Sequence, residues 1–587
     1  MKAKLLKDLV VLRKEFQQWD RVLTWSEDGT LYFSTIPEFT VGQPLYSKDI
    51  KRSSKDLFHL TSIDFPIMDN KLEFEDSKDN ILLNSQPQSY IRMCKPCPYN
   101  SSLIAAITNN GNIIIYHDYK PILNMDQEGR NLQERTYHSF AWDVKGNTLA
   151  VGNESSELIL FSIDYSTNTY SSKTVKLSDG NGWITKIVWN NFGLIAASSD
   201  NTVYFMQDLD KQEPISTIIL PSSRFKINDL LLMKKTVFVS VCGNIFKINI
   251  STGQRINVAV DPTCEYLFIP LYMNNEVILL SNKASHIVKL LDDDIILHPD
   301  NIVFPYLKKK RQKWQDLGNQ YNKYEIDLSI YGLALSLDQY SVAIAYSIQR
   351  VSFKYKIMSE NKFNVMFIPL YESWSLSSKG SGMLWFQTYN IYGKQLPVTP
   401  NNSVNTTEDN NIDTDLEFVD YLNMLVKTSA IIKRMFQNMI DPDSISMVLF
   451  RESILKYAKA HKDKLINPMD KLCVESLFEI LRKESIFEIK NDDTIVIKGE
   501  FIEQTFNIFG NGNQQIINSI EGNSWRRCSL TLLPLLTTNT KICPASNQRI
   551  INIKKDIQND YGWFTRTLLE FFNDKSPYTG GKFSEST

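Results

Sequence analysis

Cys94 and Cys97 are separated by two residues, which is the spacing of redox-active dithiols and of many zinc-ligand pairs. A redox thiol needs a helix N-terminus or a nearby cation to lower its pKa. This pair instead precedes an apolar segment typical of a strand, and Pro96 and Pro98 favour a loop around it. Structural zinc takes four ligands, and no further ligands with matching spacing lie nearby. We therefore expect both thiols to be structural.

Cys528 and Cys543 form a second pair with a chemical interpretation, because two thiolates at this distance are half of a ribbon-like zinc site. No histidine follows His461, and no third cysteine lies between residues 525 and 587. We therefore predict no metal ligand and no bound cofactor. The odd total of seven cysteines, scattered along the chain, argues against a disulfide framework and fits a reducing compartment.

Residues for catalysis are scarce. The sequence lacks a phosphate-binding loop of the Gly-x-x-x-x-Gly-Lys-Ser/Thr type, a Gly-x-Ser-x-Gly elbow, a His-Glu-x-x-His helix and an acetyl-CoA-binding turn. It contains only six histidines. His138 lies beside an apolar strand and is expected to be a packing residue. We therefore predict no catalytic residue and no enzymatic activity.

One run of cations is a candidate contact for phosphates or for an acidic partner, or a nuclear-import signal. It lies beside Trp314 and consists of Lys308, Lys309, Lys310, Arg311 and Lys313. The alternative is a solvated helix face. The whole chain has 64 Lys and Arg against 66 Asp and Glu, a formal charge of -2. Because such a chain lacks a strong positive field, we expect DNA contact mainly through a complex.

The segments that position these residues share one pattern, in which a short apolar strand, a turn with Asp, Asn or Gly, and an alternating strand follow each other. Trp142 and Trp189 precede the same turn in neighbouring copies and lie 47 residues apart, near the propeller-blade period of about 40 to 45 residues. The clearest copies are Leu23 to Thr35, Leu103 to His117, Phe140 to Ile163 and Ile184 to Met206. Weaker copies are Ile227 to Ile250, Tyr266 to Leu290 and Ile330 to Tyr355.

These copies predict a mainly β fold, a diverged, seven-bladed WD40-like β-propeller over residues 1–394. Radial repetition is how many short strands avoid long exposed edges. No copy carries the Gly-His to Trp-Asp signature of strict WD repeats. A pair of β-sandwiches and two smaller propellers are the alternatives. A helical insertion is expected within residues 301–325, between the sixth and seventh copies.

A polar linker rich in Asn and Thr over residues 395–414 marks the end of the propeller. A separate, helix-rich α+β domain is predicted over residues 415–574. One helical face is expected from Leu416, Val419, Leu422, Leu425 and Val426, continuing to Met439. Further helices are expected over 444–460, 469–482 and 561–573, a strand pair over 485–498, and a disordered tail over 575–587.

Bulk properties exclude some classes of protein. Hydrophobic residues make up 43% of the chain, which is a globular composition. The N-terminus mixes charges through its apolar residues without the apolar core of a signal peptide. Apolar runs fall far short of the roughly 20 residues that a membrane helix needs. We therefore expect an intracellular protein that does not enter membranes.

The stretch Trp525 to Ile553, followed by Asn559 to Arg566 (NDYGWFTR), resembles the C-terminal signature of the propeller subunits of TFIIIC, a general factor of RNA polymerase III. The segments Leu5 to Trp25, with Pro44 after it, and Tyr137 to Gly152 resemble the propeller half of the same family. The likeness runs over essentially the whole chain.

The resemblance implies a nuclear, non-enzymatic scaffold in the B-box-binding part of TFIIIC at tRNA genes. It implies pairing with a second propeller-bearing subunit, contact with the large DNA-contacting subunit, and a link to the TATA-binding protein and TFIIIB. Relatives carry a zinc-finger-like module with a Cys-x-x-Cys pair. Here Cys543 is followed by Pro544, Ala545 and Ser546, so residues 525–553 are expected to be a degenerate module. A propeller scaffold of another nuclear or trafficking assembly is the alternative.

Overall fold

The structure of this chain is a computed structural model. It describes residues 7–11, 15–16, 22–44, 58–67, 90–125, 132–290, 294–321, 326–350, 363–375, 398–399, 413–427, 445–488, 493–578 and 583–585, with short gaps inside several of these ranges. The chain divides into two compact units, one made of residues 1–43 and 60–372 and the other of residues 44–59 and 373–587.

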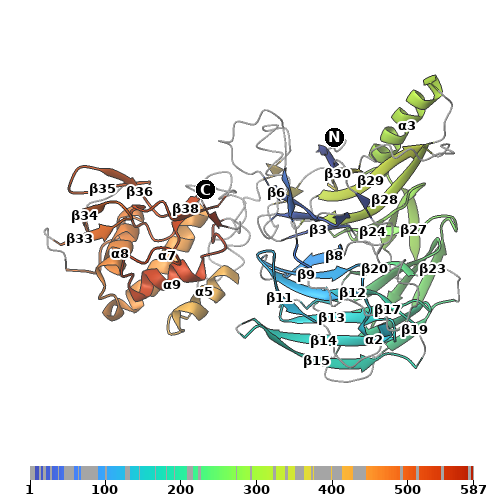
Figure 1. The fold of residues 1–587 in the computed structure, drawn as a ribbon, viewed down its shortest axis with the longest axis horizontal. Coiled ribbons are helices and arrows are strands. Elements are labelled where there is room, and N and C mark those ends of the chain that lie inside the picture. Colours follow the sequence, from blue (N-terminus) through green and yellow to red (C-terminus); the bar gives the residue numbers. More distant parts are fainter. Residues whose placement is uncertain are drawn as a thin grey trace, which may run out of the picture. The chain divides into compact units, whose positions relative to one another are not determined.

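The first unit contains seven four-stranded sheets among its described residues (Figure 1). The first three sheets are β3 (Leu23–Trp25), β4 (Leu31–Phe33), β6 (Phe39–Pro44) and β7 (Phe58–Ile63); β8 (Ile91–Pro96), β9 (Leu103–Thr108), β10 (Ile113–His117) and β11 (Lys120–Asn124); and β12 (Tyr137–Trp142), β13 (Thr148–Asn153), β14 (Glu157–Asp164) and β15 (Thr169–Lys176).

The next three sheets follow without interruption along the chain. They are β16 (Ile184–Asn190), β17 (Gly193–Ser198), β18 (Thr202–Met206) and β19 (Ser216–Ile219); β20 (Ile227–Met233), β21 (Thr236–Val241), β22 (Asn244–Asn249) and β23 (Arg255–Ala259); and β24 (Leu267–Leu271), β25 (Glu276–Leu280), β26 (Ser285–Leu290) and β27 (Ile295–Pro299). The last sheet joins β28 (Ile326–Leu335), β29 (Ser341–Arg350) and β30 (Phe363–Pro369) to β1 (Lys7–Val11).

The sheets form a ring through their first strands. β3 contacts both β8 and β28, and β16 contacts both β12 and β20. Side chains of several first strands bond to the main chain of the next. Thr24 Oγ1 donates to the carbonyl of Cys94 at 2.8 Å, and Ser139 Oγ donates to that of Ile184 at 2.8 Å. The predicted seven-bladed propeller is therefore confirmed.

The ring is closed by the N-terminal strand, which the sequence pattern did not assign. β1 pairs antiparallel with β30, from Lys7 opposite Phe367 to Val11 opposite Phe363. The last blade thus takes one strand from the start of the chain and three from its own region. A local pattern cannot show this pairing, because the two strands lie more than three hundred residues apart.

The sequence between the sixth and seventh sheets forms the helix α3 (Phe304–Tyr321), which extends away from the sheets in Figure 1. Asp300 fixes its start, because this buried carboxylate accepts hydrogen bonds from the main-chain N–H groups of Val303 at 3.1 Å and Phe304 at 2.9 Å. Leu307 in the first turns is fully buried.

The second unit combines helices with small sheets. Its helices are α5 (Phe418–Lys427), α7 (Ile445–Ala460), η1 (Lys462–Lys464), α8 (Pro468–Ile480) and α9 (Trp563–Phe571). Its strand pairs are β33 (Thr494–Lys498) with β34 (Glu503–Asn507), and β35 (Ile516–Asn518) with β36 (Ser524–Arg526); β37 (Thr540–Cys543) lies between β38 (Gln548–Ile551) and β39 (Ser584–Glu585). The predicted α+β character of this unit is confirmed.

Aromatic side chains hold the helices of this unit together. The Phe418 ring stacks on Tyr457 of α7 at 4.6 Å and on Phe564 of α9 at 4.9 Å between centroids. Val419, which we predicted on the buried face of this helix, is 47% exposed, whereas Phe418 is 3% exposed. Leu422 and Leu425 of the predicted face are buried as expected, and Phe418 has the buried position that the pattern gave to Val419. The predicted continuation of this face beyond residue 427 lies outside the described residues.

Two further expectations for this unit were wrong. The strand pair expected within residues 485–498 is instead β33 with β34, which pairs residues on either side of Gly499. The tail expected to be disordered contains β39 and the buried Tyr578 and Phe583. Tyr578 donates from its hydroxyl to the carbonyl of Ser529 at 3.0 Å. These two aromatic side chains supply the burial that the Gly and Ser composition of the tail does not suggest.

Candidate functional site

The predicted basic run lies on α3. Lys308, Lys309 and Lys313 are exposed, and Lys310 and Arg311 are half-buried. Trp314 lies two turns after the buried Leu307, near the same face of the helix, yet it is 42% exposed. The helix therefore leaves the propeller surface after its first turns and presents cations around an exposed aromatic ring. Such a surface suits phosphates or an acidic partner.

His138 lines a small hollow between the first strands β8, β12, β16 and β20. Its Nε2 lies 2.7 Å from Oε1 of Glu154, and its ring stacks on Trp183 at 5.0 Å between centroids. Ser139 on the same wall donates its hydroxyl to the carbonyl of Ile184 in the next blade. These contacts fix the His138 imidazole and the Ser139 hydroxyl between neighbouring blades. Both side chains therefore have the contacts expected of packing residues.

Cys94 and Cys97 lie at strand β8 and not in the predicted loop. Cys94 belongs to the strand, and Cys97 follows its last residue, Pro96. Pro96 is accommodated at the strand end, where a missing N–H costs little. Cys94 packs in the apolar cluster with Tyr32 and Tyr116, whereas Cys97 packs in the cluster with Phe140. The thiols therefore face different cores, and burial raises the pKa of Cys94 far above its usual range.

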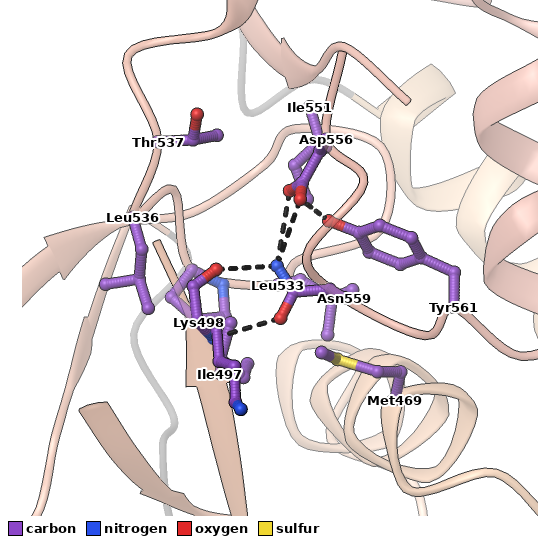
Figure 2. A pocket seen from close by; sticks show the side chains of 11 residues that line it. Met469, Ile497, Lys498, Leu533, Leu536, Thr537, Ile551, Asp556, Asn559 and Tyr561 are labelled. Carbon is purple, nitrogen blue, oxygen red and sulfur yellow. Dashed lines mark hydrogen bonds between the residues drawn. The ribbon is translucent and has the colours of Figure 1, made fainter. Parts of the chain in front are cut away.

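The signature at residues 559–566 connects three elements of the second unit (Figure 2). The side-chain amide of Asn559 accepts from the N–H of Lys498 at 2.9 Å and donates to its carbonyl at 2.7 Å. The same amide nitrogen donates to Asp556, whose Oδ2 also accepts from the Tyr561 hydroxyl at 2.7 Å. Burial and the neighbouring Asp556 carboxylate raise the pKa of Tyr561, which therefore remains a hydrogen-bond donor.

The rest of the signature begins α9, whose cap comes from another helix. Gly562 at the N-cap has no side chain, and the fully buried carboxylate of Asp470 on α8 accepts from Phe564 N at 3.1 Å, Thr565 N at 2.8 Å and Thr565 Oγ1 at 2.7 Å. A Cβ at Gly562 would overlap this carboxylate. Burial raises the pKa of Asp470, and these hydrogen bonds oppose the shift. Sequence reasoning missed Asp470, since no local signal connects it to α9.

The cysteines of this unit do not form a zinc site. Cys473, Cys528 and Cys543 are buried, and burial raises the pKa of Cys473 well above its usual range. Among the described residues, no group of three or more His, Cys, Asp or Glu side chains is placed to hold a metal ion. Structural zinc needs four ligands, so the donor set does not fit.

A buried arginine connects this segment to α8. Arg527 NH1 donates to Ser476 Oγ of α8 at 2.9 Å and to the Leu532 carbonyl at 2.7 Å. Burial lowers the pKa of Arg527 to about 10, so the side chain remains a cation at neutral pH. The guanidinium thus joins α8 to the turn after β36 through these two hydrogen bonds.

Chelation is therefore expected to leave the protein folded. A structural zinc ion contributes roughly 10 kcal/mol or more, so its removal unfolds the domain that holds it. We expect the thermal midpoint of the full chain to shift by less than about 1 °C with EDTA or 1,10-phenanthroline, and elemental analysis to find far less than one zinc per chain. Unfolding of the second unit by chelator would contradict this assignment.

The described part of the chain contains no helix long and apolar enough to cross a bilayer. The described residues define a WD40-like β-propeller followed by an α+β unit, a fold that does not by itself define a function. Residues 507–583 match the family model described as the putative zinc-finger of the transcription factor IIIC complex. Those residues contain two cysteines and no histidine.

A curated protein is similar to the chain over nearly its whole length. This chain is 44% identical to the transcription factor tau 60 kDa subunit of Saccharomyces cerevisiae over 590 residues, which cover 98% of this chain and 99% of that protein. The chain therefore belongs to the family of the transcription factor tau 60 kDa subunit, a family of TFIIIC subunits, as the resemblance in the sequence predicted.

A solved structure also shows similarity. One chain in a structure titled "Crystal Structure of Mitotic Checkpoint Complex" is 12% identical, with a TM-score of 0.42, and the match covers 63% of this chain and 96% of that one. Similarity at this level carries no information about function.

Proposed function

We propose that this chain is a non-enzymatic scaffold subunit of TFIIIC, in the B-box-binding part of the factor, and that it acts in the nucleus in RNA polymerase III initiation at tRNA genes. The observation that carries the proposal is the 44% identity over 98% of the chain to the tau 60 kDa subunit. The burial of the cysteine pair and the packing contacts of His138 support a structural role.

The proposed partners are a second propeller-bearing TFIIIC subunit, the large DNA-contacting subunit, and the TATA-binding protein with TFIIIB. Co-expression with the second propeller-bearing subunit tests the first of these contacts. We expect a stable complex that survives gel filtration, since obligate interfaces typically bury roughly 2,000 Å² or more. Separate elution of the two folded proteins would overturn this partner assignment.

The alternative is a scaffold in another nuclear or trafficking assembly. Affinity purification from the source cells distinguishes the two, because the co-purifying proteins are either TFIIIC subunits or subunits of the other assembly.

DNA binding by the isolated chain is expected to be weak and to show little sequence preference. The formal charge of -2 gives no strong positive field, and five clustered cations alone do not provide high affinity at cellular salt. We expect replacement of Lys308, Lys309 and Lys313 by glutamate to weaken DNA binding by the assembled complex equally for all duplex sequences. Fluorescence anisotropy with tRNA-gene and scrambled duplexes measures this. Nanomolar, B-box-specific binding by the isolated chain would contradict it.

A further inference from the structure

Strand β33 has one open edge. The main-chain N–H and carbonyl groups of its odd-numbered residues point toward β34. The carbonyl of Asp493, just before the strand, shows this direction, because it accepts from Ile508 N at 3.0 Å. In an antiparallel pair the peptide groups of alternate residues point to opposite sides. Those of Thr494, Val496 and Lys498 therefore point away from β34. β33 pairs with no other strand in the part of the chain that the structure describes.

Among the described residues, one position along this edge has a partner, Lys498. The amide of Asn559 exchanges two hydrogen bonds with the N–H and carbonyl of Lys498, as a residue of a neighbouring strand would (Figure 2). No described residue bonds in this way to the outward peptide groups of Thr494 or Val496. An edge with free N–H and carbonyl groups is a template for another strand. Asn559 thus marks where pairing along this edge would end.

The opposite edge of the same small sheet is covered. The carbonyl of Thr505 in β34 accepts from Ile520 N at 2.8 Å, and its N–H donates to the Glu521 carboxylate at 3.0 Å. A further strand could therefore join this sheet at β33 and not at β34.

The most exposed large apolar side chains among the described residues belong to the same unit. They are Ile557 at 89%, Phe501 at 85% and Ile466 at 78% exposure. Single exposed apolar residues are common on protein surfaces, but a cluster of them marks an interaction site.

These three side chains belong to segments that meet near the hydrogen bonds between Asn559 and Lys498. Ile557 precedes Asn559 by two residues, and Phe501 is in the turn that follows β33. Ile466 is next to Asn467, whose amide donates to the carbonyl of Asp560 at 3.1 Å. The hydrogen bonds of Asn467 and Asn559 thus bring the three segments to the end of β33.

A small hollow, open to solvent, lies beside Lys498 and Asn559. Its apolar wall is made by Met469, Ile497, Leu533, Leu536 and Ile551. An extended segment has side chains that alternate between faces. A strand along β33 can therefore rest one side chain against this apolar wall and pack others against Val496.

We propose that the open edge of β33 and the adjoining hollow bind an extended apolar segment of another polypeptide. The segment adds a strand through Thr494 and Val496 and rests one aliphatic side chain against the apolar wall beside Asn559, with Phe501, Ile557 and Ile466 flanking it. Main-chain pairing provides affinity in this mode, and the hollow provides specificity. The surface is defined by its own geometry and does not depend on which assembly the chain joins.

A random twelve-residue peptide library displayed on phage, selected on the full chain, tests the proposal. We expect enrichment of peptides with alternating aliphatic residues. The selected peptides should bind the Val496→Pro variant at least tenfold more weakly than the unchanged chain. This substitution removes an outward N–H group and leaves the hydrogen bonds to β34 in place. Val496→Thr is the matched control and should bind within twofold of the unchanged chain. Hydrogen exchange should slow at Thr494 and Val496 when peptide is bound.

Folding of the variants is verified by their thermal midpoints. If Val496→Pro unfolds, the double variant Phe501→Asp with Ile557→Asp replaces it, because both side chains are largely exposed. Equal binding to the unchanged chain and the edge variant overturns the proposal, as does a library without enriched peptides. Self-association in sedimentation that Val496→Pro abolishes also overturns it, because the occupant is then a second copy of the chain.

Discussion

Replacing Phe418 by alanine is expected to destabilise the second unit by about 3–5 kcal/mol, the usual cost of removing a buried aromatic side chain. Phe418 is 3% exposed and contacts α7 and α9 at once, through the rings of Tyr457 and Phe564. It is the first residue of α5. Its loss leaves a cavity between three helices, so the unit should unfold at lower temperature in calorimetry while the propeller transition stays unchanged.

Val419→Ala is the matched control, since it alters the next residue of the same helix. Val419 is 47% exposed, and substitutions of exposed side chains usually change the free energy of unfolding by less than about 0.5 kcal/mol. The helical pattern in the sequence predicts the reverse order, with Val419 buried. Equal losses in the two variants, or a larger loss at Val419, would contradict the packing of α5 described above.

Replacing Asp470 by alanine is expected to cost roughly 2–4 kcal/mol, because it removes the cap of α9 and leaves two buried N–H groups without their acceptor. The effect should appear in the structure of α9, although Asp470 lies on α8, 94 residues before Phe564. Faster hydrogen exchange over Trp563–Phe571, together with a lower thermal midpoint, measures it.

Two variants separate the cap from other effects. Asp470→Asn keeps one acceptor oxygen and should lose less than the alanine variant. Asp463→Ala removes an exposed carboxylate in the neighbouring η1 and should leave the exchange of α9 unchanged. Unchanged exchange of α9 in Asp470→Ala would show that the carboxylate does not hold this helix.

The sequence indicated the propeller because its repeating unit is local. The copies around Trp142 and Trp189 each contain a strand, a turn and a strand within about 25 residues, and these became β12 to β14 and β16 to β18. The period therefore revealed the seven blades. The closing strand β1 has no such copy, since its partner β30 lies at the other end of the propeller.

The candidate site was predictable only in part, because its contacts join residues that lie far apart in the sequence. The Cys-x-x-Cys spacing suggested a chemical pair, but residues three apart on an extended strand lie on opposite faces, so the two side chains enter different apolar clusters. Arg527 and Asp470 act through contacts with Ser476 and Thr565, which are 51 and 95 residues away. Polar contacts over such separations leave no periodic signal in a single sequence.

The pairing of β1 with β30 sets the order of events during synthesis. The strand made first leaves the ribosome long before its partner exists, since Val11 pairs with Phe363. At 5–20 residues per second, this interval is roughly 20–70 s. During that time the nascent chain carries an incomplete ring and an unsatisfied strand, and the propeller can close only after its seventh blade has been translated.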